Sequence, residues 1–521
     1  MTATTIRDLL LSHAGSPAPA LRWRDDDGGV RDWSWAEYVG AASALARAIE
    51  ARFDPDRPPH VGVLLGNGPA LALHLAAAGL GGHVLVGLNN TRRGGALARD
   101  VQRADCQFVI TDTDHRALLA EVDVPVVLSD APGRETRSLT SRDDHSVDVG
   151  PDSLFMLIFT SGTSGDPKAV RVTHRKIAHL AGYMSERLGL DGDDVHYVSM
   201  PLFHSNAVMA GWAPALATGA CVAVAPFSAT GFLPDVRAFG ATYANYVGKP
   251  LAYILATPAT PGDADNPLRL VFGNEAGERD IEEFARRFDC RVIDGFGSTE
   301  NAVVISRVPG TPPGSLGRPA DDVAVLDPET ERECPRATYD STGAVTNLDE
   351  CVGELVNTSG SGQFDGYYND PDATAERLRG GKYWSGDLAY RDADGWVYYA
   401  GRTSDWLRVD GENLAAAPIE RILLRHPMIS EAAVYAVPDP RAGDQLMVTL
   451  VLRGPLDPAA FGAFLAEQDD LGTKSWPRFV RIADQIPRTA TNKVLKRDLR
   501  EAGAASATWR RGERDRTYVI M

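Results

Sequence analysis

With 521 residues, the chain is longer than a single compact core usually spans, so we expect at least two domains. Its 44% hydrophobic and 24% charged residues exclude an intrinsically disordered chain. The 53 basic against 70 acidic residues give a net charge of −17, which argues against nucleic acid or an anionic membrane surface as the main partner.

Neither a secretory leader nor a membrane span is expected. Residues 1–20 lack a basic region followed by a long apolar run. The most apolar stretch, residues 70–88, contains His74, His83 and four glycines, so a buried helix followed by a strand is the better interpretation. The five cysteines are scattered without metal-ligand spacing, which favours reduced thiols and a cytoplasmic location.

Apolar runs of strand length alternate with helical patterns from about residue 60 onward. The alternation is found at residues 61–65, 70–78 and 84–88, and again at residues 268–272, 279–288 and 291–293. Each strand of the second group ends in a loop rich in Gly, Asn, Asp, Ser or Thr. This pattern predicts an α/β fold of layered sheets and helices that holds its ligands in the loops after the strands.

The sharpest local motif is FTSGTSGDPK at residues 159–168, after an apolar run at 154–158 and before a helical segment from His174. Glycines let backbone N–H groups approach phosphate oxygens, hydroxyls donate further hydrogen bonds, and Lys168 adds positive charge. The motif therefore predicts a polyphosphate-binding loop. The spacing of the common nucleotide P-loop is absent. Neither Gly-rich cluster, at 66–68 or 295–297, has the third glycine of a dinucleotide site.

A change in composition at residues 401–410 predicts a domain boundary. We expect a large N-terminal domain at residues 1–402 and a small α+β domain at residues 403–521. Beyond the boundary we expect a helix at residues 418–425, strands at 432–437 and 446–452, a helix at 458–468, a strand at 479–482 and a final loop and helix.

Five blocks of the chain resemble, in the same order, the signatures of the adenylate-forming superfamily, which includes acyl-CoA synthetases, luciferases and peptide-synthetase adenylation domains. The blocks are the loop at 159–168, GFGSTE at 295–300, YWSGDL at 383–388, GRTSD at 401–405 and the segment 487–496. The resemblance implies a large α/β domain with a barrel-like β subdomain, a small mobile α+β domain and ATP-dependent acyl-CoA synthetase activity. The combination Pro167-Lys168-Ala169 and the segment GNE at 273–275 are similar to the fatty-acid-transport-protein-like branch of long-chain and very-long-chain fatty-acid-CoA ligases.

The resemblance also implies roles for single residues at the nucleotide. Glu300 would bind a magnesium ion between the phosphates, Thr299 would contact the α-phosphate, and Lys493 would reach the α-phosphate and the carboxylate during adenylation. Asp387 and Arg402 would bind the ribose hydroxyls. The other ATP or AMP contacts that it implies are Thr160, Ser161, Gly162, Thr163, Ser164, Gly165, Lys168, Gly273, Asn274, Glu275, Phe296 and Gly297, with Phe296 against the adenine.

For the acid and coenzyme A, the resemblance implies an apolar pocket and a rotating small domain. His204 resembles the residue that gates the acyl pocket, and we expect Val208, Trp212 and Tyr246 among its walls. Asp405 would be the hinge, and Gly411 would lie beside the pantetheine tunnel. The implied small-molecule partners are ATP with Mg²⁺, coenzyme A and a carboxylic acid. A homodimer and peripheral membrane contact remain open.

Three functions compete on the sequence alone. The first is an acyl-CoA synthetase for a medium to very long fatty acid, or for a bulky acid such as a steroid side chain. The second is an acyl-AMP ligase that loads a carrier protein, and the third is a catalytically silent fatty-acid binding or uptake protein. The joint presence of Glu300, Asp387, Arg402 and Lys493 argues against the silent protein, because binding alone would not need all four.

Overall fold

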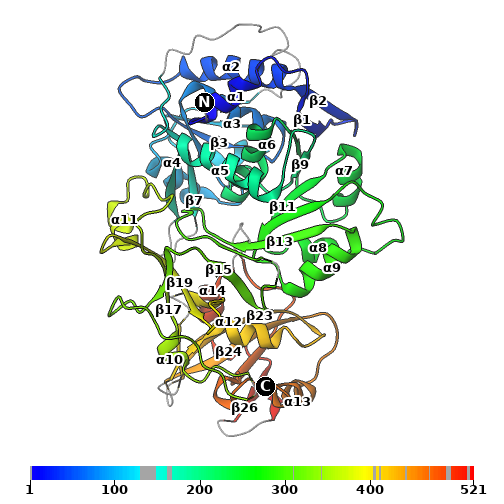
Figure 1. Cartoon of the computed structure of the whole chain (residues 1–521), viewed down its shortest axis with the longest axis vertical. Helices are drawn as coiled ribbons and strands as arrows, with labels where there is room; N and C mark the ends of the chain where they lie inside the picture. Colours follow the sequence, from blue (N-terminus) through cyan, green and yellow to red (C-terminus); the bar gives the residue numbers. More distant parts are fainter. Residues whose placement is uncertain are drawn as a thin grey trace. The chain divides into compact units, whose positions relative to one another are not determined.

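The computed structural model describes residues 3–129, 148–160, 167–308, 310–341, 343–402, 406–409, 412–439, 443–468, 470–488, 494–512 and 517–521. Contacts along the chain divide it into two compact units. Unit 1 consists of Met1–Asn301 and Gln363–Ala375, and unit 2 of Ala302–Gly362 and Glu376–Met521. Figure 1 labels their helices and strands in chain order.

A six-stranded sheet of unit 1 carries the hairpin of the predicted phosphate loop at one edge. In spatial order its strands are β6 (Val126–Leu128), β5 (Phe108–Thr111), β3 (His60–Leu64), β4 (Val84–Gly87), β7 (Leu154–Thr160) and β8 (Lys168–Thr173). Neighbouring strands are parallel except β7 and β8, which are antiparallel. Strand β3 is buried at every position, as expected for a parallel strand covered on both faces.

Seven further strands of unit 1 follow one another in a second sheet. Their order is β13 (Arg291–Phe296), β12 (Leu270–Asn274), β11 (Tyr243–Val247), β9 (Val195–Val198), β10 (Cys221–Val224), β1 (Pro19–Arg24) and β2 (Val30–Ser34). All neighbours in this row are parallel except β1 and β2. The carboxyl ends of β9, β11, β12 and β13 therefore lie along one edge, where α/β folds hold their ligands.

Helices cover the sheets of unit 1. They are α1 (Ile6–Ser12), α2 (Trp35–Glu50), α3 (Pro69–Gly81), α4 (Gly94–Arg103), α5 (His174–Leu188), α6 (Ala213–Thr218), α7 (Phe232–Phe239), α8 (Pro250–Leu255) and α9 (Glu278–Phe288), with a π-helix at Ala207–Trp212. Helix α5 begins at the cap Thr173, whose hydroxyl accepts a hydrogen bond from the Lys176 N–H at 3.3 Å. It ends at Gly189, where φ is +62°, a left-handed conformation that glycine adopts without strain.

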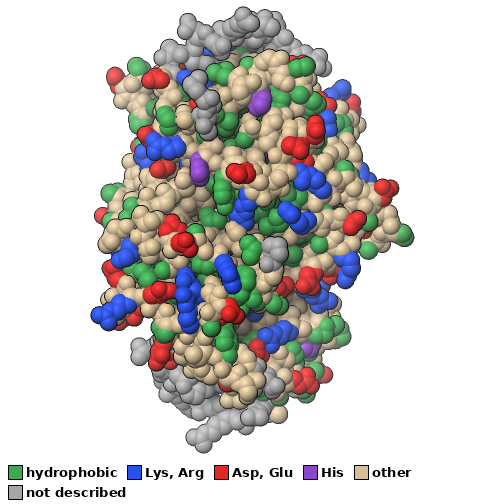
Figure 2. Space-filling view, in the orientation of Figure 1, with side chains coloured by type: hydrophobic (Ala, Val, Ile, Leu, Met, Phe, Trp, Pro, Cys, Tyr) green, Lys and Arg blue, Asp and Glu red, His purple; other side chains and the backbone are tan. Residues whose placement is uncertain are grey.

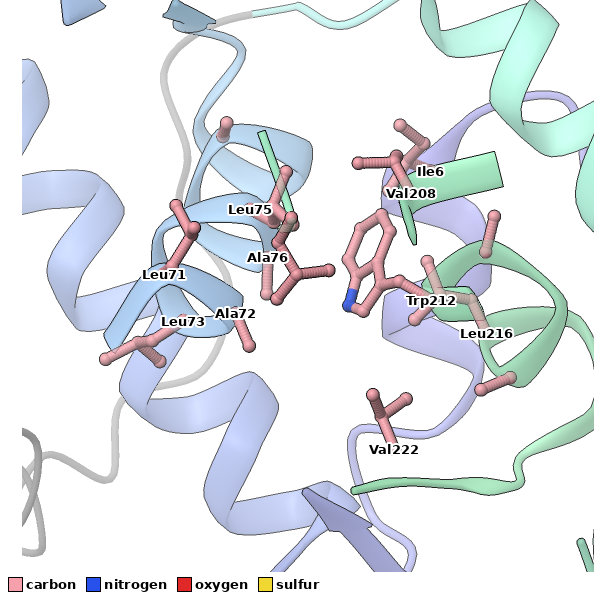
Figure 3. Packing of buried hydrophobic residues seen from close by; sticks show 14 of the residues in the cluster. Ile6, Leu71, Ala72, Leu73, Leu75, Ala76, Val208, Trp212, Leu216 and Val222 are labelled. Carbon is pink, nitrogen blue, oxygen red and sulfur yellow. The ribbon is translucent and has the colours of Figure 1, made fainter. Parts of the chain in front are cut away.

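The largest hydrophobic cluster packs α3 against the π-helix and α6. Figure 3 shows the indole of Trp212 in its centre, with Leu75 and Ala76 of α3 on one side. The indole is fully buried and donates a hydrogen bond to the hydroxyl of Tyr38 at 3.1 Å. It also stacks on the ring of Phe155 at a centroid distance of 6.0 Å. Such an aromatic anchor buries a large apolar area while its one polar atom is satisfied.

Unit 2 contains a mainly antiparallel sheet followed by a smaller α+β region. The sheet has the order β16 (Val323–Leu326), β17 (Gly353–Asn357), β19 (Lys382–Arg391), β20 (Val397–Arg402), β15 (Ser315–Pro319) and β14 (Ile305–Ser306), with β18 (Leu378–Arg379) beside β19. Two short helices are α10 (Leu348–Cys351) and α11 (Pro371–Arg377), the second of which crosses from unit 1 into unit 2.

The C-terminal region is built on a five-stranded sheet. Its strands are β23 (Ile429–Asp439), β24 (Gly443–Leu452), β25 (Phe479–Ile482), β26 (Trp509–Arg511) and β27 (Tyr518–Ile520). A separate hairpin pairs β21 (Trp406–Val409) with β22 (Glu412–Ala415). The helices of the region are α12 (Ala416–Leu423), α13 (Pro458–Ala466) and α14 (Lys496–Ala502).

The predicted order of strands and helices is confirmed, with bounds that differ by a few residues. The apolar stretch 70–88 forms α3 followed by β4, and no helix in the described part of the chain is long and apolar enough to cross a membrane. The prediction missed α1, α2, β1 and β2 before residue 60, and β8 between the phosphate loop and α5. The expected boundary between residues 402 and 403 falls inside unit 2 and stays a prediction.

Charged side chains of both signs share the visible surface. On the face in Figure 2, Lys and Arg side chains are interspersed with Asp and Glu side chains. The acidic excess of the sequence is therefore not gathered into a single acidic field on this face of the described residues.

Candidate active site

The phosphate loop is framed by two strands. Thr160 ends β7, Lys168 begins β8, and the two residues are direct cross-strand partners. The Thr160 hydroxyl lies 3.5 Å from the carbonyl oxygen of Lys168. The intervening predicted residues Ser161, Gly162, Thr163, Ser164 and Gly165 lie outside the described residues.

Glu300 lies in a buried position beside this hairpin. The residue is only 8% exposed, and its Oε1 accepts a hydrogen bond from the hydroxyl of Tyr367 at 2.7 Å. The ammonium group of Lys168 lies over the same tyrosine ring, 5.2 Å from its centroid. The tyrosine thus links the lysine expected at the phosphates to the carboxylate expected at the metal.

Lys176 holds the backbone at Thr299 and Glu300. It is 1% exposed, and its ammonium group donates hydrogen bonds to the carbonyl oxygens of Thr299 at 3.0 Å and Glu300 at 2.9 Å. Burial lowers the pKa of Lys176 to about 8, while the nearby carboxylates of Glu300 and Asp365 oppose that shift. Two consecutive carbonyl groups of the site are therefore held by one buried cation.

Thr299 is fixed through its side chain as well. Its hydroxyl lies 2.9 Å from the hydroxyl of Ser205, which follows His204 in the loop before the π-helix. The next residue, Asn206, donates to the side-chain oxygen of Asn274 at 3.3 Å and accepts from Asn245 at 2.6 Å. These hydrogen bonds join the loop after β9 to the carboxyl ends of β11 and β12.

The predicted adenine turn follows β12 and lies beside the end of β13. Asn274 pairs with Gly295 across these strands, and its amide donates to the Gly295 carbonyl at 2.6 Å. Glu275 has a φ of +67°, an unusual left-handed conformation for a residue with a side chain. Phe296 ends β13, next to Gly297. The Gly273-Asn274-Glu275 turn and Phe296 therefore lie at the ends of neighbouring strands, and their contacts with adenine stay a prediction.

Of the four residues expected at an acyl pocket, three belong to the packed core. Val208 and Trp212 are fully buried in the cluster of Figure 3. Tyr246 is 2% exposed among the residues that pack under α7, α8 and α9, and its hydroxyl donates to Asp294 at 2.7 Å. His204 lies in the loop after β9, with its ring 4.3 Å from that of Phe203. The acyl-pocket role of all four stays a prediction.

In unit 2, the two residues predicted at the ribose lie opposite each other on neighbouring strands. Asp387 of β19 and Arg402 of β20 are cross-strand partners, and the Arg402 Nε lies 3.2 Å from Asp387 Oδ1. The Tyr399 hydroxyl donates to the same carboxylate oxygen at 3.4 Å. Asp387 is buried and Arg402 is half-buried. The pair therefore combines an acceptor and a charged donor in one place.

Three predicted residues of the C-terminal domain cannot be placed. Lys493, Asp405 and Gly411 lie outside the described residues, so their roles in catalysis, the hinge and the pantetheine tunnel stay predictions.

A magnesium ion fits the chemistry of the donors present. Glu300 offers a single hard oxygen ligand, and no group of three or more His, Cys, Asp or Glu side chains suited to a metal occurs among the described residues. Mg²⁺ is usually bound by one or two carboxylates together with substrate phosphates and water, rather than by a cage of protein ligands. One carboxylate beside a phosphate loop matches that pattern.

Sequence reasoning missed Lys176, Tyr367 and Ser205. Lys176 could have been found from its spacing, because it shares the buried face of α5 with Leu180 and Met184 at intervals of four residues. A lysine on the apolar face of a helix is rarely buried unless a hydrogen-bond acceptor or an opposite charge pairs with it in the core. Tyr367 had no such local signal, since its partner Glu300 lies 67 residues away along the chain.

Two family models match most of the chain. The family described as AMP-binding enzyme matches residues 13–368, and the family described as AMP-binding enzyme C-terminal domain matches residues 418–493.

Two similar proteins are named as CoA-thioester-forming enzymes. The medium/long-chain-fatty-acid–CoA ligase FadD17 of Mycobacterium marinum is 55% identical over 90% of this chain and 92% of its own length. The steroid-22-oyl-CoA synthetase of Rhodococcus jostii is 47% identical over 96% of this chain and 91% of its own length.

Among solved structures, ATP-bound MatB from Rhodopseudomonas palustris aligns with a TM-score of 0.82 at 24% identity, covering 96% of this chain and 99% of that one. At that level of identity the likeness concerns the fold.

Proposed function

This chain belongs to the AMP-binding enzyme family, and on that premise we propose which acid it activates and which of its residues hold the nucleotide. The chain is an ATP-dependent acyl-CoA synthetase. Such an enzyme converts a carboxylic acid and ATP to an acyl-adenylate and pyrophosphate. It then transfers the acyl group to the thiol of coenzyme A and releases AMP.

The observation that carries the nucleotide assignment is the buried Glu300, whose partner Tyr367 also lies under Lys168. The carboxylate is 8% exposed and accepts a hydrogen bond from the Tyr367 hydroxyl, and the Lys168 ammonium lies over the same ring, which supports a role for Glu300 as the metal ligand. Magnesium bound there would supply positive charge to the β- and γ-phosphates as pyrophosphate leaves.

The other side chains of the site would bind and orient the substrates. Thr160 and Lys168, at the two ends of the hairpin, would bind the β- and γ-phosphates. Thr299, held by Ser205, would donate to the α-phosphate. Lys493 would bring a positive charge to the α-phosphate and the attacking carboxylate, which stabilises the charge that develops in the transition state. Asp387 and Arg402 would bind the ribose hydroxyls.

The proposed acid is a medium- or long-chain fatty acid. The support for it is the 55% identity, over 90% of this chain, to a ligase named for such acids. A steroid acid with its carboxyl group on the side chain is the second candidate, because a synthetase named for that class is 47% identical over 96% of this chain. Both candidates are long lipophilic acids that require an apolar binding site.

Several finer features belong to the same proposal. Rotation of residues 403–521 about Asp405 would exchange the adenylating arrangement for the thioester-forming one, with Gly411 beside the pantetheine. The five cysteines, all free thiols, support a reducing compartment such as the cytoplasm. A homodimer and peripheral contact with a membrane that supplies the acid complete the proposal.

The test is CoA-dependent AMP formation with a panel of acids. The panel contains saturated fatty acids from short to very long, an aromatic acid, and steroid acids with side chains of different length. We expect the highest kcat/KM with a medium- or long-chain fatty acid. A higher kcat/KM with a steroid acid would replace the first candidate by the second, and pyrophosphate release without any thioester would contradict the synthetase activity.

A further inference from the structure

The backbone of Glu300 is already immobilised by a buried cation. Lys176 donates to the carbonyl oxygens of Thr299 and Glu300, and Asn301, the next residue, turns the chain with a φ of +54°. Neither carbonyl group can move far without losing its hydrogen bond to Lys176. The backbone of Glu300 is therefore fixed, and the orientation of its carboxylate depends on the contacts of its side chain.

The Tyr367 hydroxyl occupies one carboxylate oxygen of Glu300. The hydrogen bond from this hydroxyl to Oε1 is 2.7 Å long, the ordinary length of an O–H···O bond. This bond holds one carboxylate oxygen in place and thereby restricts the rotation of the carboxylate group.

Tyr367 is itself held firmly. It is 5% exposed, and its N–H donates to the Thr374 hydroxyl at 3.0 Å. An isolated bridge pairs it with Val170 of β8, and Phe364 packs edge-on against its ring at a centroid distance of 5.0 Å. Because Tyr367 is itself fixed by these contacts, its hydroxyl can hold the carboxylate of Glu300 in one orientation.

We propose that Tyr367 is a positioning residue, which holds the carboxylate of Glu300 in the orientation in which it would bind the metal and, under the Lys168 ammonium, fixes Glu300 relative to the phosphate lysine. The inference rests on the proposed role of Glu300 as the magnesium ligand. Hydrogen bonds to the ligands of a metal typically matter by about 10- to 100-fold in metal affinity or activity. Tyr367 does not touch the reacting atoms in this account.

The test replaces Tyr367 with phenylalanine, which removes only the hydroxyl and keeps the ring under Lys168. Calorimetry would measure the affinity for ATP at a fixed low magnesium concentration and, separately, the affinity for AMP. We expect Tyr367→Phe to weaken magnesium-dependent ATP binding by about 10-fold and to raise the magnesium concentration for half-maximal pyrophosphate release to a similar extent. AMP binding should stay unchanged, because AMP lacks the two phosphates that share the metal.

The neighbouring tyrosine provides a matched control. Tyr368 lies in the same loop, but its hydroxyl donates to Asp105 at 3.0 Å and not to the site. Tyr368→Phe should bind ATP and AMP as the unmodified chain does. The inference is wrong if Tyr367→Phe binds magnesium ATP normally, or if it loses AMP affinity to the same extent as ATP affinity, since that would be general damage to the site.

Glu300→Gln separates this inference from the assignment beneath it. If Glu300→Gln weakens magnesium-dependent ATP binding and Tyr367→Phe does not, Glu300 remains the metal ligand and only the positioning role is overturned. If Glu300→Gln leaves that binding unchanged, the metal assignment fails and the inference fails with it.

Discussion

Gly273 shows how one residue at the end of β12 constrains the site. A methyl group at this position would lie 2.5 Å from the Cδ1 of Tyr246 and would also clash with the backbone carbonyl oxygen of Tyr246. Because Tyr246 is buried and hydrogen-bonded to Asp294, neither its ring nor its carbonyl group can move away. The close approach between β11 and β12 therefore requires glycine.

The first prediction concerns this position. Gly273→Ala should lower the free energy of unfolding by roughly 1–3 kcal/mol through overpacking, as measured by denaturant unfolding. Gly297→Ala is the control, because nothing lies within 4 Å of the methyl group it would add. Equal stability of the Gly273→Ala and Gly297→Ala variants would show that β11 and β12 can separate more easily than their packing indicates.

The second prediction concerns Asp387. Its carboxylate lies 3.2 Å from the guanidinium Nε of Arg402, and we propose that it binds the ribose hydroxyls. Asp387→Asn should weaken ATP binding by roughly 10-fold, since a hydrogen bond to a charged group is worth about 1.5–3 kcal/mol. The binding of 2′,3′-dideoxy-ATP should be much less affected, because the hydroxyl groups that the carboxylate accepts from are missing. An equal loss for both nucleotides would place Asp387 away from the ribose.

At the scale of elements, parallel strands explain why distant motifs meet. The strands β9, β11, β12 and β13 run in the same direction, so the loops after them share one edge. The hydrogen bonds of Asn206 to Asn245 of β11 and to Asn274 of β12 then join the segment after β9 to these two strands. The π-helix that follows Asn206 is a rare conformation often found beside functional sites.

The sequence predicted elements well where burial is complete. Strand β3 and the first four residues of β12 are buried and mainly apolar, and α3 is apolar on all sides, so periodicity and length suffice. Strand β8 was missed because its six residues mix charged and apolar types directly before a helix. Short edge strands of this kind depend on their partner, here β7, and not on their own composition.

Only those residues of the site that stand in recognisable sequence motifs could be predicted. Lys168 stands in a motif whose local chemistry predicts phosphate binding, whereas the roles expected of Thr299 and Glu300 are implied only by the family resemblance of their block. Tyr367 could not be inferred, since its position beside Glu300 depends on how the chain returns to unit 1 after residue 362.

The residues expected at the acyl pocket could not be derived from the sequence for the same reason. Tyr246 and Asn245 are neighbours on β11, yet only Asn245 hydrogen-bonds toward Asn206, because alternate side chains of a strand point to opposite faces.

For the molecule as a whole, three buried histidines contribute to its response to acid. Burial lowers the pKa of His74, His174 and His196 to about 4 from an ordinary value of 6.5. For His174 the positive charge of Arg7 adds to the shift and the nearby Asp8 opposes it. Neither ring nitrogen of His174 has a hydrogen-bond partner among the described residues, so the ring is held neutral.

The third prediction follows from this arrangement. Between pH 6.5 and 4 the unfolded chain binds protons at these histidines and the folded chain does not, so stability is complete above pH 6.5 and falls as the pH falls. At pH 5 each histidine should cost on the order of 2 kcal/mol of unfolding free energy. Between pH 7.5 and 5, the free energy of unfolding should fall less in the His174→Leu variant than in the unmodified chain, as measured by denaturant unfolding at each pH. An equal loss in both proteins would exclude His174 as a source of acid sensitivity.

The central claim is that the chain activates its acid as an adenylate before coenzyme A reacts. The most direct measurement mixes the enzyme with the preferred acid and magnesium ATP, quenches the reaction before and after coenzyme A is added, and identifies every product by mass spectrometry. We predict an enzyme-bound acyl-adenylate with an equal amount of pyrophosphate in the first phase, converted to equal amounts of acyl-CoA and AMP in the second. Formation of ADP and phosphate, or of acyl-CoA with no adenylate before it, would contradict this account.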